Sequence, residues 1–201
     1  MSRRVAKKGF LADYSVEDTY LLRPDRARGR AGILRARDPQ SHDILIKFWP
    51  RVKDVDDQDL EDIWRSEIRQ LQRLAAVPGA DDLFVHMITN GKDTEGFYLV
   101  LDPGQGSPLE VFLRSARKPD LLAQARQPRS RRVLWANARR LAQALELLHS
   151  QGAIHRNLDP WAEVTALTDE PDFRITGFEW SMRRFWLQFR YFCFERAGPA
   201  I

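Results

Sequence analysis

The amino-acid sequence predicts an α+β fold in which an antiparallel sheet comes first and helices follow. Two early stretches, "GRAGILRARD" and "HDILIKFWP", have strand-like patterns and are separated by the turn signal "DPQSHD". Two other stretches repeat apolar residues at steps of three and four, which indicates amphipathic helices. We therefore expect an antiparallel sheet with one main helix, followed by a smaller and mainly helical part.

The acidic run "KDVDDQDLED" leads into the first predicted helix. Acidic residues in its first turns and arginines further on suit the direction of the helix dipole. Two strands, "LFVHMITN" and "GFYLVLD", then form a predicted hairpin around "GKDTE". The apolar stripe of this helix consists of Leu60, Ile63, Trp64, Ile68, Leu71 and Leu74.

The second half begins with a predicted loop, "PGQGSP", and a short helix, "LEVFLRSARK". After a polar linker at 119–129, a long helix is predicted over "RSRRVLWANARRLAQALELLHSQG", with Gly152 as its stop. The short strands "EVTAL" and "FRIT" follow, beside the motif-like stretches "HRNLDP" and "ITGFE". The apolar face of the long helix is predicted as Leu134, Ala138, Leu141, Leu145 and Leu148.

Composition excludes a disordered or membrane-embedded chain, since 43% of residues are hydrophobic and 30% are charged. The basic N-terminus lacks the apolar run of a signal peptide, and no stretch is apolar enough to span a membrane. The lone cysteine, Cys193, fits a reducing compartment. We therefore expect a cytoplasmic protein, and its richness in arginine and alanine is typical of a GC-rich bacterial genome. The oligomeric state is not predicted.

Several short motifs, in order along most of the chain, resemble the Hanks-type serine/threonine protein kinases. "ILIKFW" is similar to the strand motif VAIK, "HRNLDPWA" to HRDLKPEN, and "ITGFE" to the segment that contains DFG. "ARGRAGILRARD" resembles the end of the glycine-rich loop, and "FYLVLDPGQGSPLEVFL" the last N-lobe strand, the hinge and the next helix. The resemblance implies a protein kinase-like fold, with a five-stranded antiparallel N-lobe that holds one main helix and a partial, mainly helical C-lobe.

The resemblance also implies a domain organisation. Residues 1–19 would form an N-terminal extension, 20–102 the kinase-like N-lobe and 103–182 a partial, mainly helical C-lobe. Residues 183–201 would be an aromatic-rich tail, so that the domain would be truncated after its DFG-equivalent.

Several residues match positions that matter in this family. The resemblance implies that Lys47 would hold the α- and β-phosphates of ATP and that Glu67 would be its ion-pair partner. His155, Phe178 and Leu71 would stack in the column of buried side chains that links the two lobes. The side chains of Ile33, Leu45 and Leu101 would line the nucleotide pocket.

The residues that carry the family's chemistry are replaced. Asn157 stands where the HRD aspartate would be, and an amide cannot act as a base near neutral pH. Gly177 and Ala162 stand at the two metal-binding positions, and neither has a ligand atom in its side chain. Asp159 replaces the lysine that would steady the transferred phosphate. These losses predict a pseudokinase that acts as a regulatory or protein-interaction module.

Nucleotide binding is predicted to be weakened as well. Leu45 replaces a small alanine that would pack on adenine, and its bulk would overfill that slot. The glycine-rich loop is also degraded, because Arg26, Arg28 and Ala31 take the glycine positions in one of two registers. The resemblance leaves residual ATP binding through Lys47 and Glu67 open and gives no expectation of a bound Mg²⁺ ion.

Two alternatives remain open at the level of sequence. Asp159, Glu163 and Glu179 lie close to the lost positions, so a displaced set of carboxylates would make the chain an atypical active serine/threonine kinase. A nucleic-acid-contacting module is a minor alternative, based on "ARQPRSRRVLWANARR" and on the arginines of 23–37. A solvated helix start explains the first stretch equally well, and no nucleic-acid motif accompanies it, so the sequence disfavours this partner.

The segment at 183–194 belongs to the tail that the resemblance does not cover. It carries Phe185, Trp186, Leu187, Phe189, Tyr191, Phe192 and Phe194. An exposed run of this kind is typical of an interaction surface, so we expect it to contact a protein partner.

Overall fold

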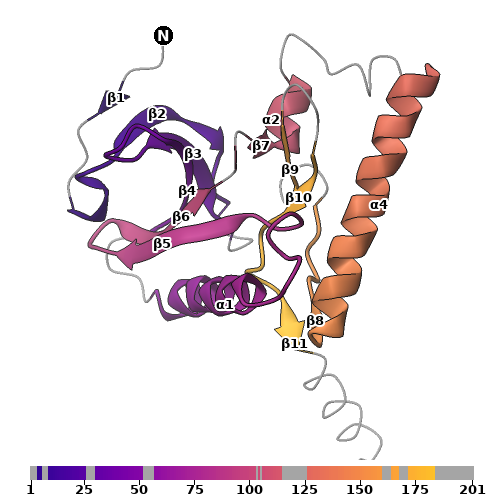
Figure 1. Ribbon diagram of the computed structural model, residues 1–201. Helices are drawn as coiled ribbons and strands as arrows, with labels where there is room; N and C mark the ends of the chain where they lie inside the picture. The colour runs from indigo at the N-terminus through magenta and orange to yellow at the C-terminus, as the bar shows by residue number, and fades with distance from the viewer. Residues whose placement is uncertain are drawn as a thin grey trace, which may run out of the picture.

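The computed structural model describes residues 4–5, 9–25, 30–51, 57–102, 104, 106–114, 126–159, 164–167 and 172–183. The fold is α+β (Figure 1). Its main sheet is antiparallel, has the strand order β1-β2-β3-β4-β6-β5, and contains the five expected strands plus a two-residue edge strand. These strands are β1 (Arg4–Val5), β2 (Ser15–Leu22), β3 (Gly32–Arg37), β4 (Asp43–Pro50), β5 (His86–Lys92) and β6 (Gly96–Asp102). Strand β2 begins ahead of the domain boundary predicted at residue 20.

Strand β4 is buried on both faces, and the alternation of its side chains separates two clusters of apolar residues. Ile44 and Ile46 point to one cluster, which also holds Val16, Tyr98 and Val100. Leu45 and Trp49 point to the other and larger cluster. Because successive side chains of a strand point to opposite faces, Lys47 shares the face of Leu45 and Trp49. The sheet thereby directs a lysine into the protein interior.

Helix α1 (Gln58–Ala75) covers this second face of the sheet (Figure 1). Its Trp64 donates a hydrogen bond from Nε1 to the backbone oxygen of Tyr98 at 3.0 Å, and its ring lies 5.5 Å from that of Phe97. Leu60 and Leu71 are buried on the same stripe. Since Glu67 falls between them at helical spacing, it too points toward the sheet.

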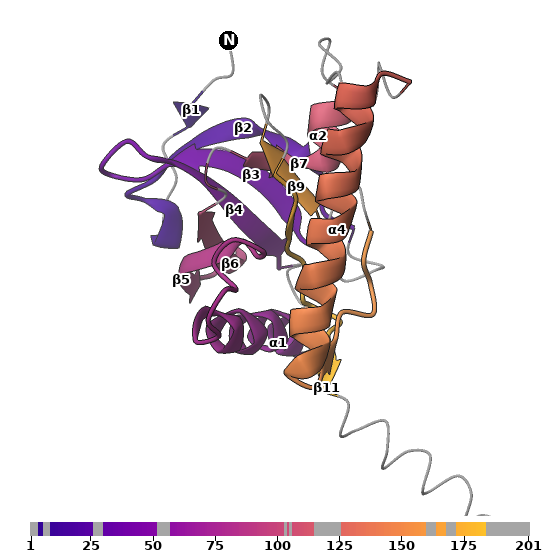
Figure 2. The same ribbon diagram turned by 45° about the vertical axis from the view of Figure 1, so that its right-hand side comes forward.

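The second half of the chain is built around α4 (Pro128–Ser150), which stands beside two small sheets (Figure 2). The three-stranded sheet contains a strand, β7, in the stretch that the sequence predicted as a loop, because its backbone pairs with β9. The remaining elements are β7 (Gly106–Pro108), α2 (Leu109–Arg114), β8 (Ala153–Ile154), β9 (Val164–Leu167), β10 (Arg174–Ile175) and β11 (Met182–Arg183).

A buried asparagine fixes α4 to the segment before β10. The Asn137 side chain donates to the Val133 backbone oxygen at 3.1 Å and accepts from the Phe173 backbone N–H at 2.8 Å. Ala138, which the sequence placed on the apolar face, is exposed instead. The buried side of α4 is thus rotated toward Asn137, whose amide oxygen satisfies the buried N–H of Phe173.

Backbone hydrogen bonds join the two halves of the chain near α1. Ile175 donates to the Leu83 oxygen at 3.0 Å, and its own oxygen accepts from Val85 at 3.1 Å. Residues that follow β10 therefore lie against α1 and the sheet. Within the part of the chain that the structure describes, no helix is both long and apolar enough to cross a membrane.

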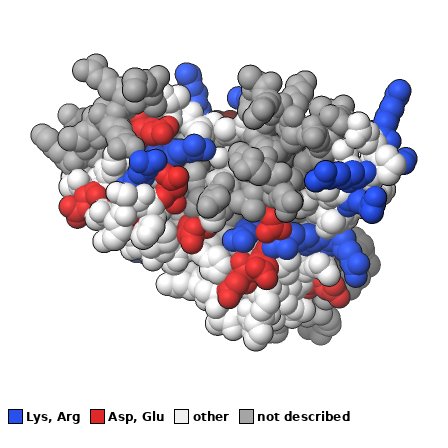
Figure 3. All heavy atoms as spheres, turned by 45° about the horizontal axis from the view of Figure 1, so that its top comes forward, with Lys and Arg blue, Asp and Glu red and all other residues white. Residues whose placement is uncertain are grey.

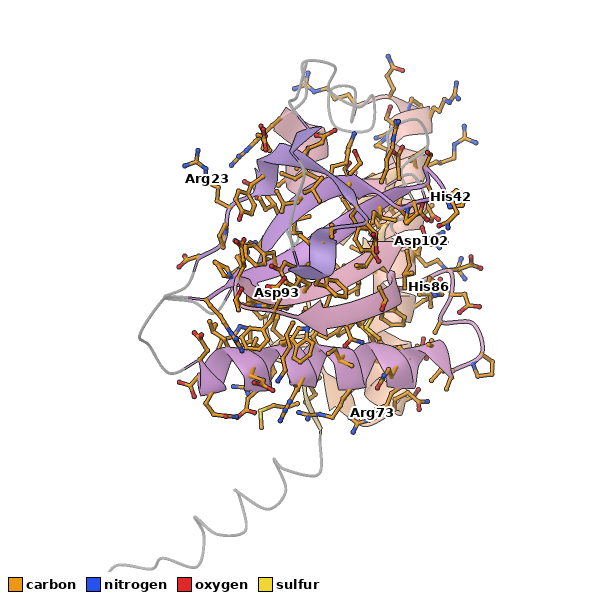
Figure 4. The ribbon with its side chains drawn as sticks, turned by 90° about the vertical axis from the view of Figure 1, so that its left-hand side faces the viewer. Arg23, His42, Arg73, His86, Asp93 and Asp102 are labelled. Atoms are coloured by element: carbon orange, nitrogen blue, oxygen red, sulfur yellow. The ribbon has the colours of Figure 1, made fainter. Side chains whose placement is uncertain are left out.

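Asp93 holds the β5–β6 turn against the 3-10 helix η1 (Gly9–Leu11), and Figure 4 shows it at this junction. Its carboxylate accepts hydrogen bonds from the Phe10 N–H at 2.9 Å and from the Tyr98 hydroxyl at 3.0 Å. It also accepts from the N–H groups of Glu95 at 2.8 Å and Gly96 at 3.2 Å. One side chain therefore closes the turn and anchors the N-terminal segment.

We expect Asp93→Ala to lower the free energy of unfolding by about 2–4 kcal/mol, because several donors lose a charged acceptor at once. Urea denaturation followed by circular dichroism measures this change. Glu95→Ala is the matched control, since Glu95 is an exposed acid in the same turn. Equal losses in the two variants would contradict the role given to Asp93.

Candidate functional site

The most unusual feature of the interior is a buried ammonium group held by two carboxylates. Lys47 Nζ lies 2.9 Å and 2.8 Å from the two carboxylate oxygens of Glu67. It also lies 2.5 Å from Glu179 Oε1. The side chains of Lys47, Glu67 and Glu179 are 2%, 0% and 2% exposed. We call these three residues the buried charge cluster.

Each member of the cluster comes from a different element. Lys47 lies in β4, Glu67 lies in α1, and Glu179 belongs to the segment after β10. An ammonium has three N–H donors, and the three hydrogen bonds to carboxylate oxygens match that number. The ring of Trp49 adds a cation–π contact, with its centroid 5.2 Å from Nζ. The donors of Lys47 are thus directed at side chains of the same chain.

The charges of the cluster do not balance, because two carboxylates face one ammonium. Burial raises the pKa of Glu67, and the negative charge of Glu179 raises it further; Lys47 opposes both effects, and the resulting pKa is about 7. The Phe178 N–H lies 3.4 Å from Glu67 Oε1, whereas Glu179 Oε2 is buried with no hydrogen-bond partner. The cluster is therefore suited to hold one additional proton near neutral pH.

His155 lies close to the cluster and is held in a neutral form. Its Nε2 is 2.8 Å from the Thr176 backbone oxygen, and because a carbonyl only accepts, Nε2 carries the hydrogen. Burial lowers the pKa of His155, an effect that outweighs the hydrogen bond to Thr176. The rings of His155 and Phe178 lie 5.1 Å apart, and Phe178 belongs to the same apolar cluster as Leu71. These are the three residues expected to stack.

Asn157 and Asp159 lie in a pocket of about 320 Å³ outside the cluster. Arg30 Nη2 lies 3.1 Å from Asp159 Oδ2, which joins the start of β3 to the segment after β8. Arg156 and Trp180 complete the pocket, and the Trp180 side chain is 40% exposed. Asp159 and Glu179, predicted as parts of one displaced set, therefore have different partners, Arg30 and Lys47 respectively.

Gly177 adopts a backbone conformation that favours glycine, with φ of 80°. It lies between Thr176, which accepts the hydrogen bond from His155, and Phe178, which packs in the core. The turn that it makes brings Glu179 back toward Lys47. A glycine at this position therefore has a geometric role as well as lacking a metal ligand.

The residues expected to line a nucleotide pocket are packed in the core. Ile33, Leu45 and Leu101 are 5%, 2% and 1% exposed and belong to one apolar cluster with Phe178. Leu45 lies opposite Leu101 in the β4–β6 pair, and Ile33 lies opposite Lys47 in the β3–β4 pair. These side chains contact other apolar side chains of the protein.

Several predicted site residues lie outside the described residues. They are Ala162 and Glu163, the glycine-loop positions 26–29, and the aromatic segment beyond Arg183. Among the residues that the structure describes, no three His, Cys, Asp or Glu side chains are grouped so as to hold a metal ion.

Comparison with known proteins gives no family assignment, since no family model and no curated protein matches the chain.

Sequence reasoning identified Lys47 and Glu67 as a pair, and the pair is present. It named Glu179 only as a displaced carboxylate, and its position two residues after Gly177 was the available signal. The pocket residues Arg30 and Trp180 were not identified, because only the fold brings them together.

We expect the unfolding free energy of the wild-type protein to contain a contribution that falls as pH rises from about 4.5 to about 7. In this window the folded protein keeps a proton on the carboxylate pair that the unfolded chain has released, so the slope is negative and at most about 1.4 kcal/mol per pH unit. Glu179→Gln removes the like charge and should flatten this slope. Urea unfolding at several pH values measures it.

Glu146→Gln is the control for this experiment, because Glu146 is exposed on α4. Its pH dependence should equal that of the wild type. Identical slopes for wild type and Glu179→Gln would show that the two carboxylates do not share a proton.

Proposed function

We propose that this chain is a kinase-like domain that does not transfer phosphate and that serves as a regulatory or protein-interaction module. The observation that carries the proposal is that the ammonium group of Lys47 forms ion pairs with both Glu67 and Glu179. In the kinase-like interpretation, Lys47 is the residue that would bind the phosphates of ATP. Glu179 takes the place that a phosphate oxygen would need.

Energetics support this interpretation. A phosphate that displaced Glu179 from Lys47 would leave a buried carboxylate without its cation, and a buried charge that loses its partner typically costs about 3–5 kcal/mol. The side chains of Leu45, Ile33 and Leu101 would also have to separate to admit an adenine ring. Both costs oppose nucleotide binding in the closed arrangement seen here.

The side chains that would carry out phosphoryl transfer are also replaced in this chain. Transfer needs a group that orients or deprotonates the acceptor hydroxyl and a metal ion that neutralises the phosphates. Asn157 is an amide, and the nearby Asp159 carboxylate is paired with Arg30 at 3.1 Å. Gly177 offers no ligand atom. A role in binding and regulation is therefore better supported than a role in catalysis.

The arrangement of the core suits such a role. His155, Phe178 and the buried charge cluster join β4, α1 and the segment after β10 into one interior, so contacts made on one element affect the others. The expected partner is a cytoplasmic protein that contacts the aromatic segment at 183–194. The alternative, an atypical serine/threonine kinase, requires Glu179 to leave Lys47 and to act with Asp159 and Glu163.

We expect the melting temperature of the full chain to be unchanged by ATP, with or without Mg²⁺, in a thermal-shift titration. Ligand at 100 times its dissociation constant would stabilise the fold by about 2.7 kcal/mol, which is readily detected. Lys47→Met is measured in parallel. A Mg²⁺-dependent rise in the wild type that is absent in Lys47→Met would replace the proposal with the atypical kinase.

A further inference from the structure

The outward side of α4 carries a cluster of arginines around an exposed tryptophan. Trp135 is 71% exposed, which is the largest value among the exposed large apolar side chains of the described residues. The surrounding arginines are exposed as well. We call this surface the α4 basic face, and it consists of Arg129, Arg131, Arg132, Trp135 and Arg139.

Helical spacing places these side chains together. Arg131 and Arg132 precede Trp135 by four and three residues, and Arg139 follows it by four, so all three flank the indole on one side of the helix. The opposite side of α4 is buried through Asn137, Ala144 and Leu148. The leucines of the helix therefore pack in or against the core, whereas Trp135 is exposed to solvent.

Among the residues that the structure describes, no neighbouring acid compensates the charge of this face. Glu146 is the one acidic residue in the α4 sequence, and it lies almost two turns after Arg139. Arg140, on the inner side, pairs with Asp172 at 2.7 Å, but none of the four arginines of the α4 basic face pairs with a carboxylate of the described residues. Lys and Arg side chains project from the right-hand edge of the molecule in Figure 3, on the side where α4 lies.

We propose that the α4 basic face binds single-stranded nucleic acid. Exposed guanidinium groups bind phosphates without regard to sequence, and an exposed aromatic ring between them offers a surface on which a base can stack. The sequence alone disfavoured this partner because the arginines could be a solvated helix start. The structure adds that they surround an exposed tryptophan on a helix that is rigidly packed on its other side.

A single strand fits this surface better than other polyanions do. Trp135 can stack only on a base face that is open, and the bases of a duplex already stack on each other. Binding at a lipid surface requires a broad apolar side of the helix, but that side of α4 is buried in the protein. An acidic protein segment would satisfy the arginines and would leave Trp135 without a stacking partner.

Fluorescence anisotropy of the full chain with fluorescein-labelled 20-nucleotide single strands, both RNA and DNA of mixed sequence, tests the proposal over a range of salt concentrations. Trp135→Ala removes the stacking surface, and Arg132→Ala/Arg139→Ala removes two phosphate contacts. The matched control is Arg65→Ala/Arg69→Ala, because these arginines are exposed on α1 and the charge change is equal. Thermal melts of each variant establish that it is folded.

We expect Trp135→Ala to weaken binding about 5- to 100-fold with an unchanged salt slope. The double arginine variant should reduce the slope of log affinity against log salt by about 1.4, and the control should match the wild type apart from a small general effect of charge. Absence of binding at low salt, equal loss in the control pair, or tighter binding to a duplex would overturn the proposal. So would binding to phosphatidylserine vesicles or polyglutamate that exceeds binding to the single strands.

Discussion

The burial of one ammonium between two carboxylates is the constraint on which the interior of this protein depends. Lys47 cannot be withdrawn to solvent, because the alternation of β4 directs it to the covered face of the sheet. Glu67 and Glu179 must therefore lie next to it, which fixes the positions of α1 and of the segment after β10. A buried ion pair of this kind adds little to the net free energy of folding, but it selects one arrangement of the chain. If α1 or the segment after β10 were shifted, a buried charge would lose its partner.

The same interaction links the structure to the proposed role. In a protein that keeps the ion pair of Lys47 and Glu67 and adds Glu179, the donors of this lysine are directed at side chains of the same chain. The surface around this interior is then available for contacts. The pocket formed by Arg30, Asp159 and Trp180 and the outward side of α4 both lie outside the core, and in the pocket the Arg30–Asp159 ion pair also joins the start of β3 to the segment after β8.

Sequence patterns predicted the long elements of the fold because those elements depend on local periodicity. The strands β3, β4 and β6 and the helix α1 have unbroken apolar patterns, whereas β7 is a Gly-Ser-Pro segment that becomes a strand only through pairing with β9. The face of α4 was also predicted incompletely: Ala138 was expected inside and is exposed, whereas Asn137 is buried and accepts a hydrogen bond from the Phe173 N–H, 36 residues away. Likewise, the resemblance predicted the pairing of Lys47 with Glu67, but the contact with Glu179 spans 132 residues and follows from tertiary structure alone.

The backbone at Gly177 has a consequence for how this protein can change. Its φ of 80° lies in the left-handed region, where a side chain costs about 1–2 kcal/mol. An aspartate at this position would meet part of that cost, since Asp adopts this region more readily than most residues, and would also add negative charge beside a cluster that already holds two carboxylates for one ammonium. In the kinase-like interpretation, an aspartate introduced here to hold a metal ion would therefore destabilise the folded state before any metal could bind. Metal binding at this position would require the turn and the partner of Lys47 to change together.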